Sequence, residues 1–156
     1  MSPQRSAGIL LYRRAPGLEV WIAHMGGPFW AKKDAGAWSI PKGLYEVGED
    51  ALAAALREFA EEMGAPAPAV DYEALGEFRY SSGKLLAVFA AEADFAVDVL
   101  ASNTFPLEWP PRSGRMQEFP EVDDARWFTV DIARQKLVKG QLPILDALEK
   151  LMAPGR

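Results

Sequence analysis

The chain contains no cysteine and a single histidine, His24, among its 156 residues. Disulfides and thiolate chemistry are therefore excluded, and any bound metal must be held by oxygen ligands or by that histidine. Basic residues are also few: 17 Lys and Arg against 22 Asp and Glu give a formal net charge of −5. This balance argues against a general nucleic-acid or anionic-membrane surface, although a small, locally basic pocket remains compatible with it.

Long apolar runs are missing as well. No segment is long and apolar enough to cross a membrane, and no signal-type hydrophobic segment follows the first residues. The sequence therefore predicts a cytoplasmic protein. Its length predicts one domain over residues 1–156 with a single core, since no repeat or linker divides it.

The hydrophobic patterning predicts an α/β fold in which a mixed β-sheet is covered by helices. Strands are expected at residues 6–14, 18–25, 37–40, 72–80, 84–93 and 124–129, and helices at 50–63, 130–137 and 142–152. The Gly and Pro content predicts loops at 26–36 and 95–116. The second is long enough to be either a lid over a ligand or an insertion.

Residues 43–65, GLYEVGEDALAAALREFAEEMGA, contain the most informative pattern. Ala, Leu and Glu dominate it and favour a helix. Either Glu49 or Asp50 is a suitable N-cap, and Gly64 is suited to the position just past the C-terminus. Apolar residues recur at helical spacing and give one face to the core.

Three carboxylates crowd another face of this helix. Glu58, Glu61 and Glu62 lie at i, i+3 and i+4, near the negative end of the helix dipole. Each like-charge contact costs about 0.3–1 kcal/mol at a surface, and Arg57 offsets part of this through Glu61. A divalent cation such as Mg²⁺, which prefers carboxylate oxygens and often accompanies substrate phosphates, would compensate the remainder. A solvated acidic face is the alternative interpretation.

The same segment matches the pattern G-x5-E-x7-R-E-U-x-E-E-x-G-U, where U is apolar, and the chain thereby resembles the Nudix hydrolases. The matching residues are Gly43, Glu49, Arg57, Glu58, Phe59, Glu61, Glu62, Gly64 and Ala65. Only Ala65 is small for its apolar position. The resemblance implies a Nudix α/β/α sandwich with the signature as a loop–helix–loop. It also implies Mg²⁺- or Mn²⁺-dependent hydrolysis of a phosphoric anhydride in a nucleoside diphosphate linked to another moiety.

The resemblance also implies roles for individual residues. Glu61 and Glu62 become metal ligands, Glu58 becomes a ligand or the general base, and Arg57 orients these carboxylates, so that all four count as catalytic. Gly43 and Gly64 are structural glycines of the signature.

Four further residues extend this site by resemblance. Glu49 is structural or a water-mediated ligand, and the backbone carbonyl of Lys42 is another ligand candidate. Many family members carry one more acidic residue on a later loop, for which Glu118 and Glu121 are candidates. The alternative interpretation is that each of these two is an ordinary surface carboxylate. For His24, the alternative to a catalytic base is an incidental residue with no part in the chemistry.

Substrate contacts are predicted at three places. The segment Trp38–Gly43, WSIPKG, resembles the W-x-x-P-K-G entry of Nudix enzymes that act on dinucleoside or inositol polyphosphates, where Lys42 would add positive charge beside a phosphate chain. Tyr80 lies sixteen residues after Gly64, as does a base-stacking tyrosine of diadenosine polyphosphate hydrolases, although a strand tyrosine also packs. In the 26–36 loop, Trp30, Lys32 and Lys33 would hold a base and phosphates, or the aromatics simply pin the loop.

Three functions remain open. The first is hydrolysis of a nucleotide anhydride such as a diadenosine polyphosphate, and the second is a MutT-like nucleoside triphosphate pyrophosphohydrolase. The third is a non-catalytic nucleotide-binding Nudix module, although such modules usually lose signature carboxylates and this chain retains them all. We expect a nucleotide-derived small molecule as partner, no nucleic-acid polymer, no membrane, and a monomer or homodimer.

Overall fold

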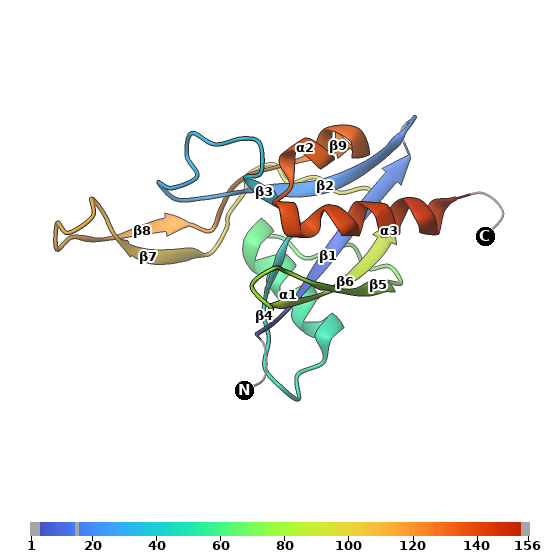
Figure 1. The fold of residues 1–156 in the computed structure, drawn as a ribbon, viewed down its shortest axis with the longest axis horizontal. Coiled ribbons are helices and arrows are strands. Elements are labelled where there is room, and N and C mark those ends of the chain that lie inside the picture. The colour runs from blue at the N-terminus through green and yellow to red at the C-terminus, as the bar shows by residue number, and fades with distance from the viewer. Residues whose placement is uncertain (1–3, 15, 154–156) are drawn as a thin grey trace.

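The computed structural model describes residues 4–14 and 16–153, and combines a mixed β-sheet with helices (Figure 1). The strands are β1 (Arg5–Arg14), β2 (Leu18–Met25), β3 (Trp38–Ser39), β4 (Lys42–Leu44), β5 (Glu73–Arg79), β6 (Leu85–Glu92), β7 (Thr104–Glu108), β8 (Met116–Pro120) and β9 (Val122–Thr129). The helices are α1 (Ala51–Met63), α2 (Val130–Lys136) and α3 (Leu142–Met152), with a short 3₁₀ turn at Lys139–Gln141. The predicted α/β class is confirmed.

Strand β1 lies at the centre of the main sheet, whose order is β3-β2-β1-β6-β5. It runs parallel to β6 along nearly its whole length. On its other edge it has two antiparallel neighbours: β4 pairs with residues 6–8, and β2 pairs with residues 12–14. The sheet therefore divides between β2 and β4 beside the middle of β1, and the site described below lies at this division.

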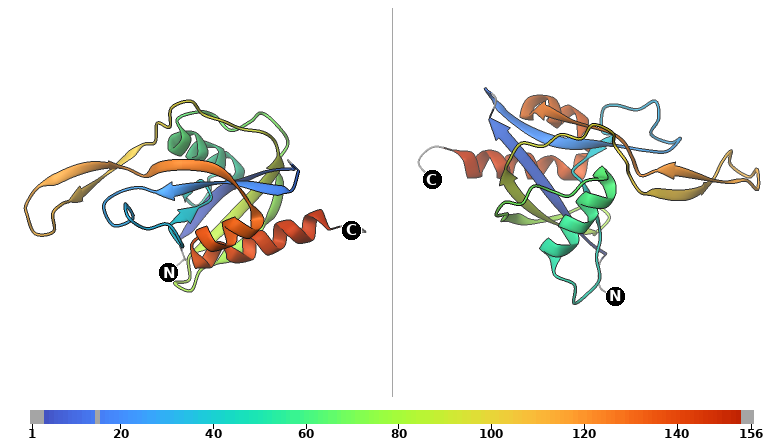
Figure 2. Two further views of the ribbon diagram at one scale, coloured as in Figure 1. Left: turned by 90° about the horizontal axis from the view of Figure 1, so that it is seen from above. Right: turned by 180° about the vertical axis from the view of Figure 1, so that it is seen from behind.

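Helices cover both faces of the sheet (Figure 2). On one face, Ala54, Ala55, Phe59 and Met63 of α1 pack against alternate residues of β1 and against β2. On the other, Ala133 of α2 and Ile144, Leu145 and Leu148 of α3 pack against the remaining set of β1 and β2 residues. The expected α/β/α sandwich is thereby confirmed. Among the described residues, no helix combines the length and apolar character needed to span a membrane.

Helix α1 begins and ends where its sequence indicates. The Asp50 side chain accepts a hydrogen bond from the Ala53 N–H at 2.9 Å, which makes Asp50 rather than Glu49 the N-cap. At the other end Gly64 adopts φ +73° and donates its N–H to the Ala60 carbonyl. A side chain there would also meet Ala101, so only glycine allows this C-cap.

The expectation of an irregular segment over 95–116 is wrong in part. Strand β7 lies within it and pairs with β8 as a separate two-stranded sheet that projects from the body (Figures 1 and 2). Pro106 lies inside β7, and proline normally argues against a strand; a two-stranded ribbon tolerates it because both strands are edges. Two smaller differences are β4, in a segment where no strand was expected, and β9, which begins at Val122 rather than Asp124.

Candidate active site

The acidic face of α1 lies against β4. Glu62 is 7% exposed, and its Oε1 accepts a hydrogen bond from the Lys42 backbone N–H at 3.3 Å. Glu58 packs against Gly43 so closely that a Cβ at this glycine would lie 2.0 Å from the Glu58 Cδ. The signature glycine is therefore required because a carboxylate occupies the space that a side chain would need.

Arg57 binds the carboxylates together. Its Nη1 donates to Glu58 Oε1 at 2.9 Å and to Glu61 Oε1 at 3.4 Å, and its Nη2 donates to Glu49 Oε2 at 3.1 Å. The predicted pairing of Arg57 with Glu61 is confirmed. Glu49 also accepts the Glu46 N–H, so it ties the loop before α1 to the arginine.

Burial raises the pKa of two of these carboxylates, Glu58 and Glu62, and so disfavours their ionised forms. Desolvation raises the pKa of Glu62 to about 8, against a partial offset from the positive charge and backbone N–H of Lys42. Desolvation, followed by the negative charge of Glu61, also raises the pKa of Glu58, and Arg57 opposes the rise. Glu121 raises the pKa of both. A cation placed among them would favour their ionised forms.

A cleft of about 390 Å³ opens beside these groups, and we call it the carboxylate cleft. Four glutamates and two lysines line it, so both signs of charge meet in one opening. The lining residues are Ser6, Lys42, Gly43, Leu44, Glu58, Glu61, Glu62, Tyr80, Lys84, Asn103 and Glu121.

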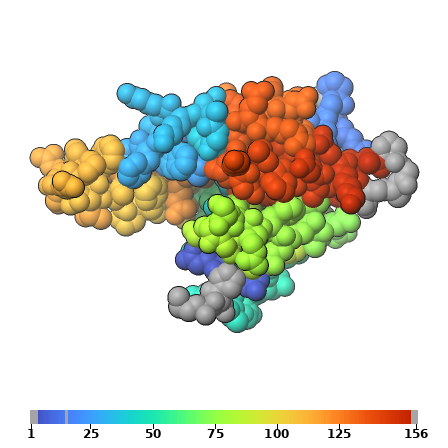
Figure 3. Space-filling model, in the orientation of Figure 1, coloured from blue at the N-terminus to red at the C-terminus, as the bar shows by residue number. Residues whose placement is uncertain are grey.

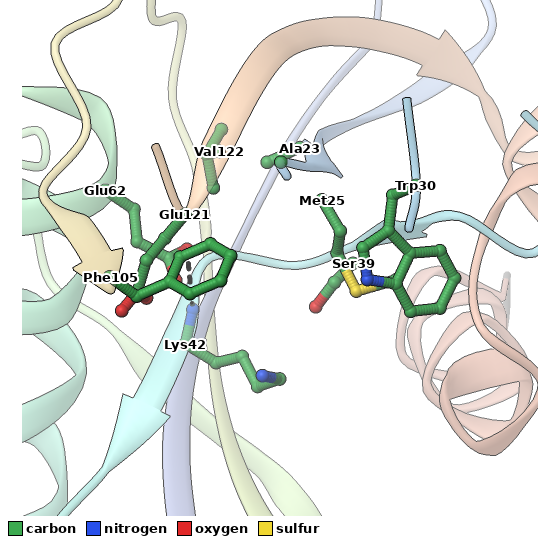
Figure 4. Close-up of a pocket in the computed structure, with 10 residues that line it drawn as sticks. Ala23, Met25, Trp30, Ser39, Lys42, Glu62, Phe105, Glu121 and Val122 are labelled. Atoms are coloured by element: carbon green, nitrogen blue, oxygen red, sulfur yellow. Dashed lines mark hydrogen bonds between the residues drawn. The ribbon is translucent and has the colours of Figure 1, made fainter. Parts of the chain in front are cut away.

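Two smaller cavities adjoin the carboxylate cleft at Lys42. The aromatic cavity, about 220 Å³, is shown in Figure 4, where Trp30 and Phe105 stand on opposite sides of the opening above Lys42. It shares Glu62 and Glu121 with the carboxylate cleft. The hydroxyl cavity, about 320 Å³, contains Tyr80, Ser81 and Ser82.

The structure separates the two later acidic candidates. Glu121 lines both the carboxylate cleft and the aromatic cavity. Glu118 instead lies exposed on the projecting hairpin, where its Oε1 accepts a hydrogen bond from Thr104 Oγ1 at 2.9 Å. Glu121 is thus the candidate that the fold brings to the other carboxylates.

The predicted substrate contacts are also divided. Lys42, Tyr80 and Trp30 line the cavities described above, whereas Lys32 and Lys33 are exposed and line none of the three. The Lys33 Nζ lies over the Trp30 ring, 5.3 Å from its centroid.

The Tyr80 ring is held by its surroundings. Its hydroxyl accepts a hydrogen bond from Gln141 Nε2 at 2.9 Å, and the ring is so close to Gly140 that a Cβ there would lie 2.5 Å from it. Burial raises the pKa of Tyr80, so the hydroxyl stays protonated at neutral pH.

His24 holds the loop that carries Trp30. Its Nδ1 is 2.6 Å from Asp123 Oδ1, and its Nε2 is 2.7 Å from the Lys33 carbonyl oxygen. Both ring nitrogens are engaged, so His24 has a structural role here, whereas the sequence had suggested an incidental one.

Among the lining residues that were not predicted from the sequence are Lys84, Asn103 and Phe105. Lys84 follows the Ser81–Gly83 turn and matches no pattern. In TFPLE, Phe105 and Leu107 recur at every second position, which is a strand signal that Pro106 conceals.

A family model described as NUDIX domain matches residues 2–148. The chain belongs to the Nudix family. It is therefore a Nudix hydrolase, of a family that acts on nucleoside diphosphate derivatives and generally uses divalent metal ions. The recognition, fold class and enzyme class inferred from the signature are confirmed.

Solved structures resemble this Nudix domain over nearly their whole length. An Ap4A hydrolase from C. elegans, as a binary complex, is 19% identical, with 94% of this chain and 97% of that chain covered and a TM-score of 0.65. The NUDIX domain of Shewanella oneidensis NrtR, complexed with ADP ribose, is 15% identical over 98% and 90%, with a TM-score of 0.67. The E. coli ORF135 protein is 22% identical over 100% and 96%, with a TM-score of 0.60. At these identities the likeness concerns the fold alone.

No curated protein sequence gives a significant match to the chain.

The candidate metal ligands of this Nudix domain are of the chemical type that a divalent cation prefers. All candidate ligands are oxygens, which Mg²⁺ and Mn²⁺ prefer. Burial raises the pKa of both Glu58 and Glu62, and a cation bound beside them would favour their ionised forms. Within residues 4–14 and 16–153, however, no three His, Asp or Glu side chains already converge as ligands of one ion. Arg57 instead occupies oxygens of Glu58 and Glu61.

Proposed function

We propose that this Nudix domain uses Mg²⁺ or Mn²⁺ to hydrolyse a phosphoric anhydride bond in a nucleoside diphosphate linked to another moiety, with a diadenosine polyphosphate as the first substrate to test. The carboxylate cleft is the observation that carries the proposal. It places four glutamates, the donors that a divalent ion needs, beside Lys42 and Lys84, which suit a phosphate chain.

Glu58, Glu61, Glu62 and Glu121, together with the Lys42 carbonyl, are the groups that would hold the ion. When bound, the ion supplies neutralisation of phosphate charge and orientation of the attacking water. Phosphoryl transfer depends on positioning and charge more than on covalent participation by the protein, which suits a site without Cys or a reactive His.

The chain's own groups divide the remaining work. Arg57 fixes the Glu58 and Glu61 carboxylates by charge-assisted hydrogen bonds. Burial raises the pKa of Glu58, which makes it a stronger base for taking a proton from water at its carboxylate oxygens. Two lysines bind the phosphates: Lys42, which lies in β4, and Lys84, which lies in the turn just before β6.

The cavities on either side of Lys42 favour a substrate with two ends. The aromatic cavity and the hydroxyl cavity both continue the carboxylate cleft, and the second contains Tyr80. A dinucleoside polyphosphate would place one nucleoside in each and its phosphate chain across Lys42. A single nucleoside triphosphate would use only one of them, so this geometry favours the first function over the MutT-like alternative.

The test is turnover of a nucleotide panel with Mg²⁺ and with Mn²⁺, followed by mass identification of the products. Cleavage of diadenosine polyphosphates is the expected result, and Glu61→Gln and Glu62→Gln should lower kcat by orders of magnitude while the circular dichroism spectrum stays native. Pyrophosphate released from single nucleotides would instead indicate the MutT-like function. Tight nucleotide binding by calorimetry without any product would indicate a non-catalytic module, and no turnover of any member would refute the proposal.

A further inference from the structure

Glu121 lies at the root of the projecting hairpin, between two different sheets. Strand β8 ends at Pro120 in the separate two-stranded sheet, and β9 begins at Val122 in the seven-stranded sheet. Figure 3 shows the hairpin (yellow to orange) as an arm at one end of the molecule, beside the 26–36 loop (light blue). Glu121 belongs to neither strand, so the ladder of neither sheet fixes its position.

A row of backbone hydrogen bonds holds Glu121 instead. The Asn103 N–H donates to the Glu61 carbonyl at 2.9 Å, and the Glu121 N–H donates to the Asn103 carbonyl at 2.9 Å. On the other side, the Gly26 N–H donates to the Glu121 carbonyl at 2.9 Å. Both backbone polar groups of Glu121 are thus engaged, and a single residue, Asn103, connects its backbone to that of Glu61 in α1.

The 101–103 segment in turn lies against the end of α1. A Cβ at Gly64, the C-cap of this helix, would lie 2.7 Å from both the Cβ and the carbonyl oxygen of Ala101. Asn103 lines the carboxylate cleft together with Glu61 and Glu121. The position of Glu121 relative to the helix carboxylates therefore follows from how this segment packs on α1.

Ser102 supplies the side chain that completes this connection. Its Oγ accepts the Val122 N–H at 3.1 Å and donates to the Asn103 carbonyl at 2.7 Å. That carbonyl also accepts the Glu121 N–H, so both of its lone pairs are used. The serine hydroxyl thus holds the residue that follows Glu121 and the carbonyl group to which Glu121 itself is bonded.

From this position Glu121 acts on the other carboxylates. Figure 4 shows Glu62 and Glu121 on the same side of the opening, near Lys42. After burial, which is the largest cause, the negative charge of Glu121 contributes to the raised pKa of Glu58 and of Glu62. Hydrogen-bonding partners that orient the ligands of a metal typically contribute about 10–100-fold to its binding.

We infer that Ser102 is a positioning residue for Glu121: its hydroxyl holds this carboxylate among those of α1 and thereby sets the affinity of the site for a divalent cation. The inference rests on the proposed function, in which Glu121 is one of the groups that would hold the ion. Ser102 itself acts through the backbone and touches neither the ion nor the substrate.

The experiment measures Mn²⁺ binding to the substrate-free protein by electron paramagnetic resonance of the unbound ion. Ser102→Ala should raise the Kd for Mn²⁺ about tenfold, the lower end of what partners of metal ligands contribute. Ser102→Thr keeps the hydroxyl and should restore the wild-type Kd. In turnover assays, the Mn²⁺ concentration that gives half-maximal rate should rise in Ser102→Ala, while kcat at saturating Mn²⁺ stays within about twofold of the wild type.

Ser113→Ala is the matched control, because the Ser113 hydroxyl also accepts a backbone N–H, that of Arg115 at 3.1 Å, but at the tip of the hairpin. Its Kd should equal that of the wild type. Glu121→Gln should itself weaken Mn²⁺ binding, and Ser102→Ala added to it should change the Kd by less than about twofold, because the serine acts through that carboxylate. Ser102→Cys, whose thiol forms only weak hydrogen bonds, is a second variant of similar size and should shift the Kd in the same direction as Ser102→Ala.

The outcomes separate this inference from the proposed function. An unchanged Mn²⁺ Kd in Ser102→Ala, or an equal rise in Ser113→Ala, would overturn the positioning role alone. So would a full additional loss when Ser102→Ala is combined with Glu121→Gln. If the wild type hydrolyses no nucleotide but binds Mn²⁺, and Ser102→Ala weakens that binding, the proposed function fails and the positioning role stands. A wild type that binds no Mn²⁺ would overturn both.

Discussion

Replacing Glu62 by Gln should stabilise the metal-free protein at alkaline pH while it abolishes activity. Burial raises the pKa of Glu62 to about 8 in the folded state, whereas the unperturbed value is 4.5. The folded protein therefore retains a proton that the unfolded chain loses. The stability associated with this group is fully present below about pH 4.5 and is lost as the pH rises through about 8.

The size of the effect follows from the two pKa values. At about 1.4 kcal/mol for each tenfold change in an equilibrium constant, the wild type should be about 3–5 kcal/mol less stable at pH 8 than it would be with a neutral side chain at this position. Gln supplies that neutral group, and its carbonyl oxygen can still accept the Lys42 N–H. For a chain of this length the gain corresponds to a rise in Tm of about 8–16 °C at pH 8, and to almost none at pH 4.

Urea denaturation of metal-free wild type and Glu62→Gln across pH 4–9 is the assay. Glu61→Gln is the matched control, because the Glu61 side chain is 40% exposed and pairs with Arg57. Mg²⁺ at pH 8 should stabilise the wild type more than Glu62→Gln, since the ion favours the ionised carboxylate. A stability difference independent of pH, or a variant less stable than the wild type at pH 8, would refute the reasoning.

Three other substitutions test the geometry of the site and core. Gly43→Ala places a methyl group 2.0 Å from the Glu58 Cδ and should lower kcat about 100-fold with a native circular dichroism spectrum, whereas wild-type kinetics would contradict the close packing. Arg57→Lys keeps the positive charge but loses the paired N–H donors of the guanidinium, so kcat should fall about 10–100-fold in steady-state assays. The free energy of unfolding from urea denaturation should change by less than about 1 kcal/mol. A larger loss of stability would show that Arg57 has a structural role instead. Phe59→Ala leaves a cavity at a fully buried position and should lower the free energy of unfolding by about 3–5 kcal/mol in urea denaturation. A loss below about 1 kcal/mol would show that Phe59 does not contribute to the core.

Helix α1 and its charges could be predicted from sequence because their determinants are local. The Asp50 cap, the Gly64 C-cap and the spacing of the three glutamates all lie within fifteen residues. Even the pairing of Arg57 with Glu61 follows from helix periodicity.

The contribution of Lys84 depends on contacts that local sequence does not reveal. This lysine reaches the carboxylate cleft because β6 runs parallel to β1, with Leu85 opposite Arg5. A parallel register between segments so far apart has no signal in a single sequence. The same limit applies to Phe105, whose hairpin is fixed by the approach of Pro120 to Gly26.

The β7–β8 hairpin forms its own two-stranded sheet, apart from the seven-stranded sheet against which α1 packs with its carboxylates. Its residues can consequently be exchanged without disturbing the hydrogen-bond ladder around β1. Substitutions on this arm can therefore change the wall that Phe105 gives to the aromatic cavity, while Arg57 and the glutamates of α1 keep their positions. The shape of that cavity is thus free to diverge between related chains without any change in the carboxylate cleft.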